Sequence, residues 1–150
     1  MKKLMNIIIV ACLLVGIIYV MKRDDEKVIV EEIKKIIISV NDRDLIVELE
    51  KNSSANAFYN RLKKESITIK THDNGNYEKI GNLEFELPRN DETNESKSGD
   101  LFLYNGNQIT LFYDTNKFKS TKLGHVTNLD SYELKELLGS GDLIMKFSVK

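Results

Sequence analysis

Alternating apolar and polar residues, the pattern typical of β-strands, recur along most of the chain after residue 35. Two such runs, at residues 36–40 and 45–50, flank a polar turn and predict a β-hairpin. Shorter runs bounded by turn residues predict further strands at residues 67–70, 83–87, 101–104, 108–113, 122–126 and 143–149. An Asn-Gly pair at positions 105 and 106 predicts a tight hairpin, because both residues tolerate positive φ.

Two segments show the 3.6-residue period of amphipathic helices instead. The first has apolar residues at i, i+3, i+4 and i+7 from Ala55, after a candidate N-cap at Ser53 or Ser54. The second begins at an N-cap, Asp130, and Glu133 completes a capping box. Many short strands with two isolated helices predict a mainly β fold, a closed or nearly closed β-barrel capped by helices.

One stretch between the predicted strands is polar throughout. Residues 89–98 (RNDETNESKS) contain no apolar side chain, which predicts a solvated loop. Residues 115–121 are also polar, apart from Phe118. Neither segment is expected to contribute a strand.

The first two dozen residues differ from the rest of the chain. Residues 4–21 form an uncharged, mostly apolar run of 18 residues, which as a helix would span about 27 Å, close to the roughly 30 Å of a bilayer core. We expect residues 1–23 to be a signal-anchor helix, residues 24–35 a juxtamembrane spacer and residues 36–150 the globular domain. Two alternatives remain: a lipoprotein signal with lipidation at Cys12 of Ile-Val-Ala-Cys, and a cleaved secretory signal, although no A-x-A site follows.

Charge and cysteine content narrow the function classes. The chain has a net charge of −1, and without residues 1–23 it keeps 18 basic against 23 acidic residues, so we expect no nucleic-acid partner and no binding of anionic lipid by the domain surface. The short N-terminus is the easier end to keep in the cytoplasm, which predicts an extracytoplasmic domain on a single-pass anchor. A single Cys excludes an internal disulfide framework, and two His make a metal site unexpected. No cofactor is expected.

Aromatic residues are the strongest candidates for a binding surface. Tyr104, Phe112, Tyr113 and Phe118 crowd the region around the Asn-Gly hairpin. Aromatic residues on barrel strands usually belong to the core, and a minority line an apolar groove for a peptide or small molecule.

Other candidate chemistry has simpler explanations. His72 beside Asp73 could act as a base and its orienting group only with a nucleophile close in space. Glu84 and Glu86 would lie about 6.6–6.8 Å apart on a strand, a spacing known from glycosidase carboxylates. Alternating Glu is also the pattern that keeps an outer strand face in water.

Four segments of the chain, in order, resemble segments of small bacterial cyclophilin-like proteins. They are NSSANAFYNRL at residues 52–62, NYEKIGNLEFELP at 76–88, GDLFLYNGNQITLFYD at 99–114 and LKELLGSGDLIMKF at 134–147. The resemblance as a whole extends over about residues 36–149. The resemblance implies a cyclophilin-type β-barrel with two helices, in agreement with the order of elements predicted above.

The resemblance does not imply prolyl isomerase activity. True cyclophilins carry an F-H-R-V-I-x-x-F-x-x-Q-G-like stretch that supplies a catalytic Arg, whereas the nearest equivalent here, SITIKT at residues 66–71, offers only Lys70. The Trp that commonly lines the proline pocket is also missing. No catalytic residue is therefore assigned.

We expect a non-catalytic module that binds a peptide or small ligand at a groove near the barrel mouth. Arg89 is the one Arg that could swing over a barrel face beside the four aromatic residues. The alternatives are a weak peptidyl-prolyl isomerase or folding factor, and a structural module in a membrane complex.

Overall fold

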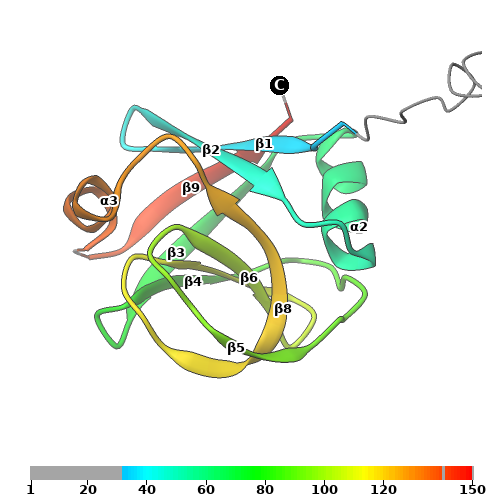
Figure 1. Ribbon diagram of the computed structural model, residues 1–150. Coiled ribbons are helices and arrows are strands. Elements are labelled where there is room, and N and C mark those ends of the chain that lie inside the picture. Colours follow the sequence, from blue (N-terminus) through cyan, green and yellow to red (C-terminus); the bar gives the residue numbers. More distant parts are fainter. Residues whose placement is uncertain (1–31, 140, 150) are drawn as a thin grey trace, which may run out of the picture. The chain divides into compact units, whose positions relative to one another are not determined.

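The computed structural model describes residues 32–139 and 141–149 (Figure 1). All the elements described below belong to one compact unit, Ile33–Lys150. These are β1 (Lys35–Val40), β2 (Arg43–Leu49), α2 (Ser53–Leu62), β3 (Ile67–Asn74), β4 (Glu78–Asn82), β5 (Glu92–Glu95), β6 (Asp100–Tyr104), β7 (Gln108–Phe112), β8 (Lys117–Val126), α3 (Ser131–Leu138) and β9 (Leu143–Ser148).

Eight antiparallel strands close into a barrel. Their order is β2-β1-β9-β3-β4-β7-β6-β8, and β8 pairs back onto β2 through the register Val47↔Val126 to Leu49↔Gly124. A Cβ atom at position 124 would lie 2.4 Å from the Glu48 carbonyl oxygen, so the closure requires glycine there. The ninth strand, β5, pairs with the first half of β8.

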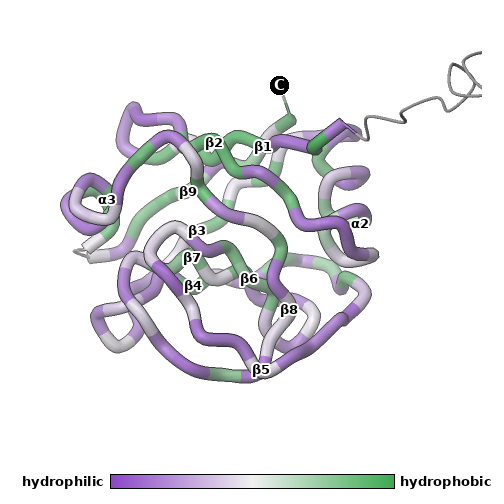
Figure 2. The backbone as a smooth tube through the Cα atoms, viewed as in Figure 1, coloured by the Kyte–Doolittle hydropathy of each residue, from purple (hydrophilic) through white to green (hydrophobic). Residues whose placement is uncertain are grey.

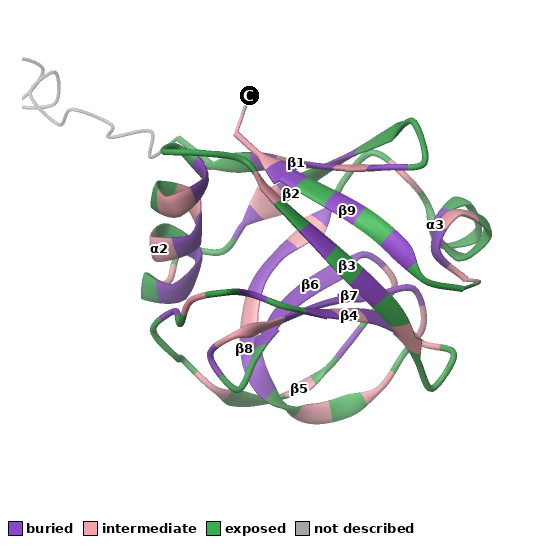
Figure 3. Ribbon diagram, turned by 180° about the vertical axis from the view of Figure 1, so that it is seen from behind, coloured by how far each residue is buried: buried purple, intermediate pink, exposed green. Residues whose placement is uncertain are grey.

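The barrel interior is filled mainly by aliphatic side chains, with Phe147 of β9 among them. Buried residues alternate with more exposed ones along β2 and β9, as the banding of β9 in Figure 3 shows. Figure 2 shows the matching alternation of apolar and polar residues along the backbone tube. Helix α2 covers one end of this core with Ala55, Phe58 and Leu62, and α3 contributes Leu134 and Leu138. The predicted mainly β closed barrel with two helices is confirmed.

Local sequence signals predicted the two hairpins and most features of the helices correctly. Both predicted hairpins form, and the Asn-Gly turn has positive φ at Asn105 and Gly106. The capping box between Asp130 and Glu133 is also present. The N-cap of α2 is Asn52, not one of the two serines, because its side chain accepts the Ala55 N–H at 2.8 Å.

The strand predicted at residues 83–87 is wrong. The strand in this region is β4, which ends before Leu83. Leu83 and Leu87 are buried, and their N–H groups donate to the carbonyls of Asn107 and Gly106 in the β6–β7 turn. Burial of two leucines against the core therefore produced an alternating pattern without a paired strand.

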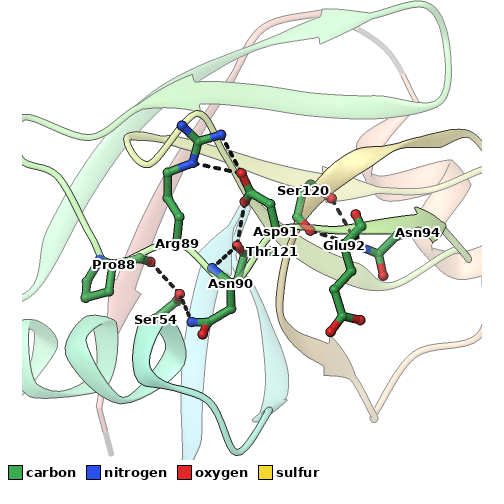
Figure 4. A network of polar contacts seen from close by, with 9 residues as sticks. All are labelled: Ser54, Pro88, Arg89, Asn90, Asp91, Glu92, Asn94, Ser120 and Thr121. Carbon is green, nitrogen blue, oxygen red and sulfur yellow. Dashed lines mark hydrogen bonds and ion pairs between the residues drawn. The ribbon is translucent and has the colours of Figure 1, made fainter.

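The solvated loop predicted at residues 89–98 is wrong in its extent. The segment contains β5, and its polar side chains bond to the domain (Figure 4). Asn90 Nδ2 donates to the hydroxyl of Ser54 at 2.7 Å, and the Thr121 hydroxyl donates to Asp91 at 2.7 Å. Asn94 Nδ2 donates to the carbonyl of Ser120. A segment without apolar residues is thus fastened to α2 and β8 by hydrogen bonds, and β8 begins at Lys117, within a segment predicted to lack a strand.

The predictions for residues 1–23, including Cys12, lie outside the described residues. Within the described ranges, neither helix has the length and apolar character that crossing a bilayer requires.

Candidate functional site

The outward face of β4, β7 and β6 differs from the inward face. Alternation places Glu78 and Ile80 outward on β4, where the register sets them opposite Phe112 and Thr110 of β7. Phe102 of β6 lies on the other side of Thr110. On β6 and β7 the outward face therefore carries large rings where the inward face carries aliphatic residues, and β4 adds the Glu78 carboxyl group to the outward face.

Five rings form an aromatic cluster on this face. The Phe118 ring centroid lies 5.1 Å from that of Phe102 and 5.0 Å from that of Phe112. Tyr77 stacks on Phe112 at 6.1 Å with an interplanar angle of 8°, and Tyr104 lies 6.5 Å from Phe118. Phe102 and Phe112 are buried beneath Phe118, so this cluster forms a second apolar layer outside the barrel core.

A cavity of about 200 Å³ opens beside this cluster, and we refer to it as the outer-face cavity. Its lining comprises aromatic, amide, aliphatic, hydroxyl and carboxyl side chains, from Asn74, Tyr77, Glu78, Ile80, Tyr104, Thr110, Asn116 and Phe118. Tyr104 is 38% exposed, so its ring is accessible to a ligand. A concave site with apolar walls and few convergent polar groups is the usual form of a small-ligand pocket.

Glu78 is the only charged residue in this lining. Its residue is 6% exposed, and its Oε1 accepts a hydrogen bond from Asn74 Nδ2 at 2.6 Å. Burial raises the pKa of the Glu78 carboxyl above its ordinary value; the Asn74 amide opposes this rise, and the nearby charge of Asp73 adds to it. No Lys, Arg or His among the described residues lies within ion-pair distance of this carboxylate.

Thr110 contributes a second unusual polar group. The residue is 1% exposed, and its hydroxyl has no hydrogen-bond partner within the described part of the chain. Buried hydroxyl groups normally have partners. The side chain lies between Ile80 and Phe102 and contributes to the lining of the outer-face cavity, although the hydroxyl oxygen itself is buried.

The structure separates the five residues predicted to bind a ligand. Tyr104 and Phe118 line the outer-face cavity, and Phe112 supports its rings from below. Tyr113 contacts a different group of residues, because its hydroxyl donates to Asp73. Arg89 lies in the segment before β5 and pairs with Asp91 (Figure 4).

Sequence reasoning overlooked most of the polar residues of the cavity. Asn74, Tyr77 and Glu78 precede or begin β4, a strand that the pattern did not indicate. Thr110 sits within a run treated only as a strand. The alternation of residues 78–82 against 108–112 could have placed Glu78 and Thr110 on one face, had the strand been recognised.

The inward side of β4 carries a different charged group. Lys79 is fully buried, and its Nζ donates to Asp73 at 2.9 Å and to the Gly141 carbonyl at 2.7 Å. It also lies 5.6 Å from the ring centroid of Tyr113. Burial alone would raise the pKa of Asp73, but hydrogen bonds from Tyr113 and Lys79 outweigh it and leave that pKa below its usual value.

The histidine and glutamate candidates do not assemble a catalytic group. His72 is exposed, while the adjacent Asp73 bonds to Lys79. His125 Nδ1 lies 2.8 Å from Asp100 Oδ1, an oxygen that also pairs with Lys122. Glu84 and Glu86 do not share a strand. Within the described ranges, no group of three or more His, Cys, Asp or Glu side chains could hold a metal ion.

Comparison with known proteins agrees with the barrel and its two helices. The sequence profile of the Cyclophilin-like family matches residues 38–148, almost the whole globular unit, and the chain therefore belongs to this family. No curated protein and no solved structure matches the chain.

Proposed function

We propose that this protein is a non-catalytic binding module whose outer-face cavity holds a segment of a peptide or a small ligand. The aromatic walls and the accessible ring of Tyr104 support this proposal, because they offer apolar contact area at low cost in side-chain entropy. The carboxyl group of Glu78, which lines the cavity, would fix the orientation of the ligand.

The charge of the cavity argues for binding without isomerisation. Catalysis of prolyl isomerisation must lower a rotational barrier of about 18–20 kcal/mol. This requires groups that bind the twisted amide better than either planar isomer. Cyclophilins do so with an Arg that donates hydrogen bonds. The lining of the outer-face cavity contains no Arg, and Arg89 pairs with Asp91 outside it. An apolar pocket alone holds both isomers similarly and accelerates little.

A cis/trans isomerisation assay with a proline tetrapeptide tests the absence of catalysis. The full chain is expected to show no rate enhancement beside an authentic cyclophilin at equal concentration. Turnover near that of the control would reject the non-catalytic proposal and favour an isomerase or folding factor.

Binding is tested by NMR titration of the full chain with a set of capped dipeptides. Ligands should shift the signals of Thr110 and Ile80, and Tyr104→Ala should weaken this binding at least tenfold. Tyr132→Ala is the matched control, since Tyr132 is 72% exposed on α3, outside the cavity lining. Equal losses in both variants, or ligand shifts elsewhere on the domain alone, would contradict the proposed site.

We further propose that residues 1–23 tether the domain to the outer face of a membrane. The 18-residue uncharged run supports this proposal. The full chain should fractionate with membranes and a version starting at Asp24 should not; two soluble fractions would reject the tether. Loss of membrane retention in Cys12→Ser would assign it to a lipid instead of a helix.

A further inference from the structure

Glu78 differs from every other acidic residue that is at least partly buried in the described part of the chain. Each of the others has a cationic side chain within about 3 Å: Glu48 with Lys35, Asp73 with Lys79, Asp91 with Arg89, Asp100 with Lys122 and Asp114 with Lys135. Glu78 is more buried than most of them, yet within the described ranges it has only the Asn74 amide as a partner. Buried charges in proteins are normally paired, so this carboxylate lacks a cation that something else could supply.

The surroundings of Glu78 suit a cation that arrives from outside. Tyr77, Tyr104 and Phe118 line the same cavity, and the electron-rich face of an aromatic ring attracts an ammonium group. The side-chain carbonyl groups of Asn74 and Asn116, which line the same cavity, can accept N–H hydrogen bonds. The lining contains no positive charge that would repel such a ligand.

We infer that the outer-face cavity binds an alkylammonium group, with Glu78 as its counter-ion and the aromatic rings as the walls around its alkyl stem. This inference rests on the proposed function, because it names the ligand chemistry of the same cavity. Two sources share this chemistry: the lysine side chain of a bound peptide, and a free primary amine. A cavity of about 200 Å³ suits a four-carbon stem with its terminal ammonium group.

A neutral ligand such as proline would be held less well. It would displace water from the Glu78 carboxylate without supplying a cation, and a buried polar group left unpaired strongly disfavours the ligand that fails to pair it. The inferred selectivity is therefore for charge, in contrast to the proline selectivity of an isomerase pocket.

The test is an NMR titration of the full chain at pH 7 with four probes. These are Nα-acetyl-lysine methylamide, its neutral isostere Nα-acetyl-norleucine methylamide, Nα-acetyl-proline methylamide and n-butylammonium. The lysine probe should shift the signals of Thr110 and Ile80 and bind at least tenfold more tightly than the norleucine and proline probes. Equal binding of n-butylammonium would assign the site to free amines, and weaker binding would assign it to a lysine within a peptide.

The variant Glu78→Gln tests whether ligand binding depends on the charge of Glu78 or only on the shape of the cavity. It keeps the size of the side chain and an oxygen that can accept from Asn74, and it should weaken the lysine probe at least tenfold while leaving the norleucine probe within twofold. Glu84→Gln is the control, because Glu84 is exposed and lies outside this cavity, so it should change neither.

The outcomes distinguish this inference from the proposed function. If the norleucine or proline probe binds the cavity as tightly as lysine in the unsubstituted chain, the inference is wrong and the binding function stands. If no probe or capped dipeptide shifts the cavity signals, both fail. Should Glu78→Gln not fold, the lysine-to-norleucine ratio measured on the unsubstituted chain decides the question alone.

Discussion

Glu78 and Lys79 are neighbours in β4, both are buried, and their side chains lie on opposite faces of the strand. Lys79 points into the barrel and is satisfied by Asp73 and the Gly141 carbonyl, with the Tyr113 ring beside it. Glu78 points outward into a cavity, where the Asn74 amide is its only partner among the described residues. One residue along a strand thus separates a charge that the fold uses from a charge that the fold leaves uncompensated.

The difference shows how to distinguish structural from functional buried charges. Desolvating a charge is unfavourable on either face, and pairing with hydrogen bonds offsets the cost. Where this offset comes from within the chain, the group contributes to folding and its removal should destabilise the domain. Where it does not, the group reduces stability, and a ligand that supplies the partner accounts for its presence.

Removing the cation on the inward face should have the largest effect. Lys79→Met keeps the length of the side chain but leaves Asp73 without a cationic partner, and breaking a buried ion pair costs about 3–5 kcal/mol. Urea unfolding followed by circular dichroism measures the loss. Lys117→Met, an exposed position on β8, should stay within about 0.5 kcal/mol of the unsubstituted chain.

Adding Asp73→Asn to Lys79→Met sharpens this result. The double variant no longer holds an uncompensated carboxylate, so it should recover part of the lost stability. A Lys79→Met variant as stable as the control would mean that the barrel does not depend on this pair, and the contrast between the two faces would disappear.

Removing the hydrogen bond between Tyr113 and Asp73 should cause a smaller loss of stability. Tyr113→Phe removes the hydroxyl that donates to Asp73, and hydrogen bonds to charged groups contribute about 1.5–3 kcal/mol. Burial, together with the adjacent Asp73, raises the pKa of Tyr113, so its hydroxyl remains a donor at every pH near neutral. Tyr132→Phe on the exposed face of α3 is the control, with no expected change.

The pH dependence of Tyr113→Phe follows from Asp73. Because the folded-state pKa of Asp73 is lowered, its contribution to stability is present above the ordinary value of 3.8 and is lost as the pH falls through the folded-state value. The difference in the free energy of unfolding between the unsubstituted chain and Tyr113→Phe should therefore be largest at pH 7 and should decrease in acid. A gap that stays constant to pH 2 would show that the bond does not depend on the Asp73 charge.

The inward face could be predicted from sequence far better than the outward one. Alternation reports which residues are buried in the core, and it located the hairpins around residues 41–44 and 105–107 because their turns carry distinctive residues. It missed β4 because Glu78 and Lys79 are polar and yet buried, which inverts the expected pattern. The order of strands and helices predicted the barrel, the family resemblance agreed with it, and the capping box predicted the start of α3.

The cavity depends on contacts that no local pattern encodes. Tyr104 and Phe118 were chosen for their aromatic character and line it, whereas Tyr113, chosen for the same reason, bonds to Asp73 instead. Adjacent positions on a strand face opposite ways, so composition alone could not separate Phe112 from Tyr113. Asn74 lies at the cavity because the β3–β4 hairpin pairs it with Glu78, whereas Tyr104 and Phe118 reach the same cavity from β6 and β8.

The smallest effect has the opposite sign and tests the outward face. Glu78→Gln should stabilise the domain, by roughly 0.5–2 kcal/mol at pH 7, as replacements of unfavourable functional groups commonly do. Burial raises the folded-state pKa of Glu78, so ionising it in the folded state is unfavourable. That cost is absent below the ordinary value of 4.5, grows as the pH rises toward the folded-state pKa, and is complete above it. The gain in stability from Glu78→Gln should show the same pH dependence, whereas Glu84→Gln should give no gain.

Thermal unfolding between pH 4 and 8 measures both variants. The contrast with Lys79 requires that Glu78→Gln gain stability in the same samples in which it loses binding of the lysine probe. A variant that loses stability at pH 7 would show that the carboxylate has a partner within the fold, and Glu78 would then join Lys79 as a structural charge.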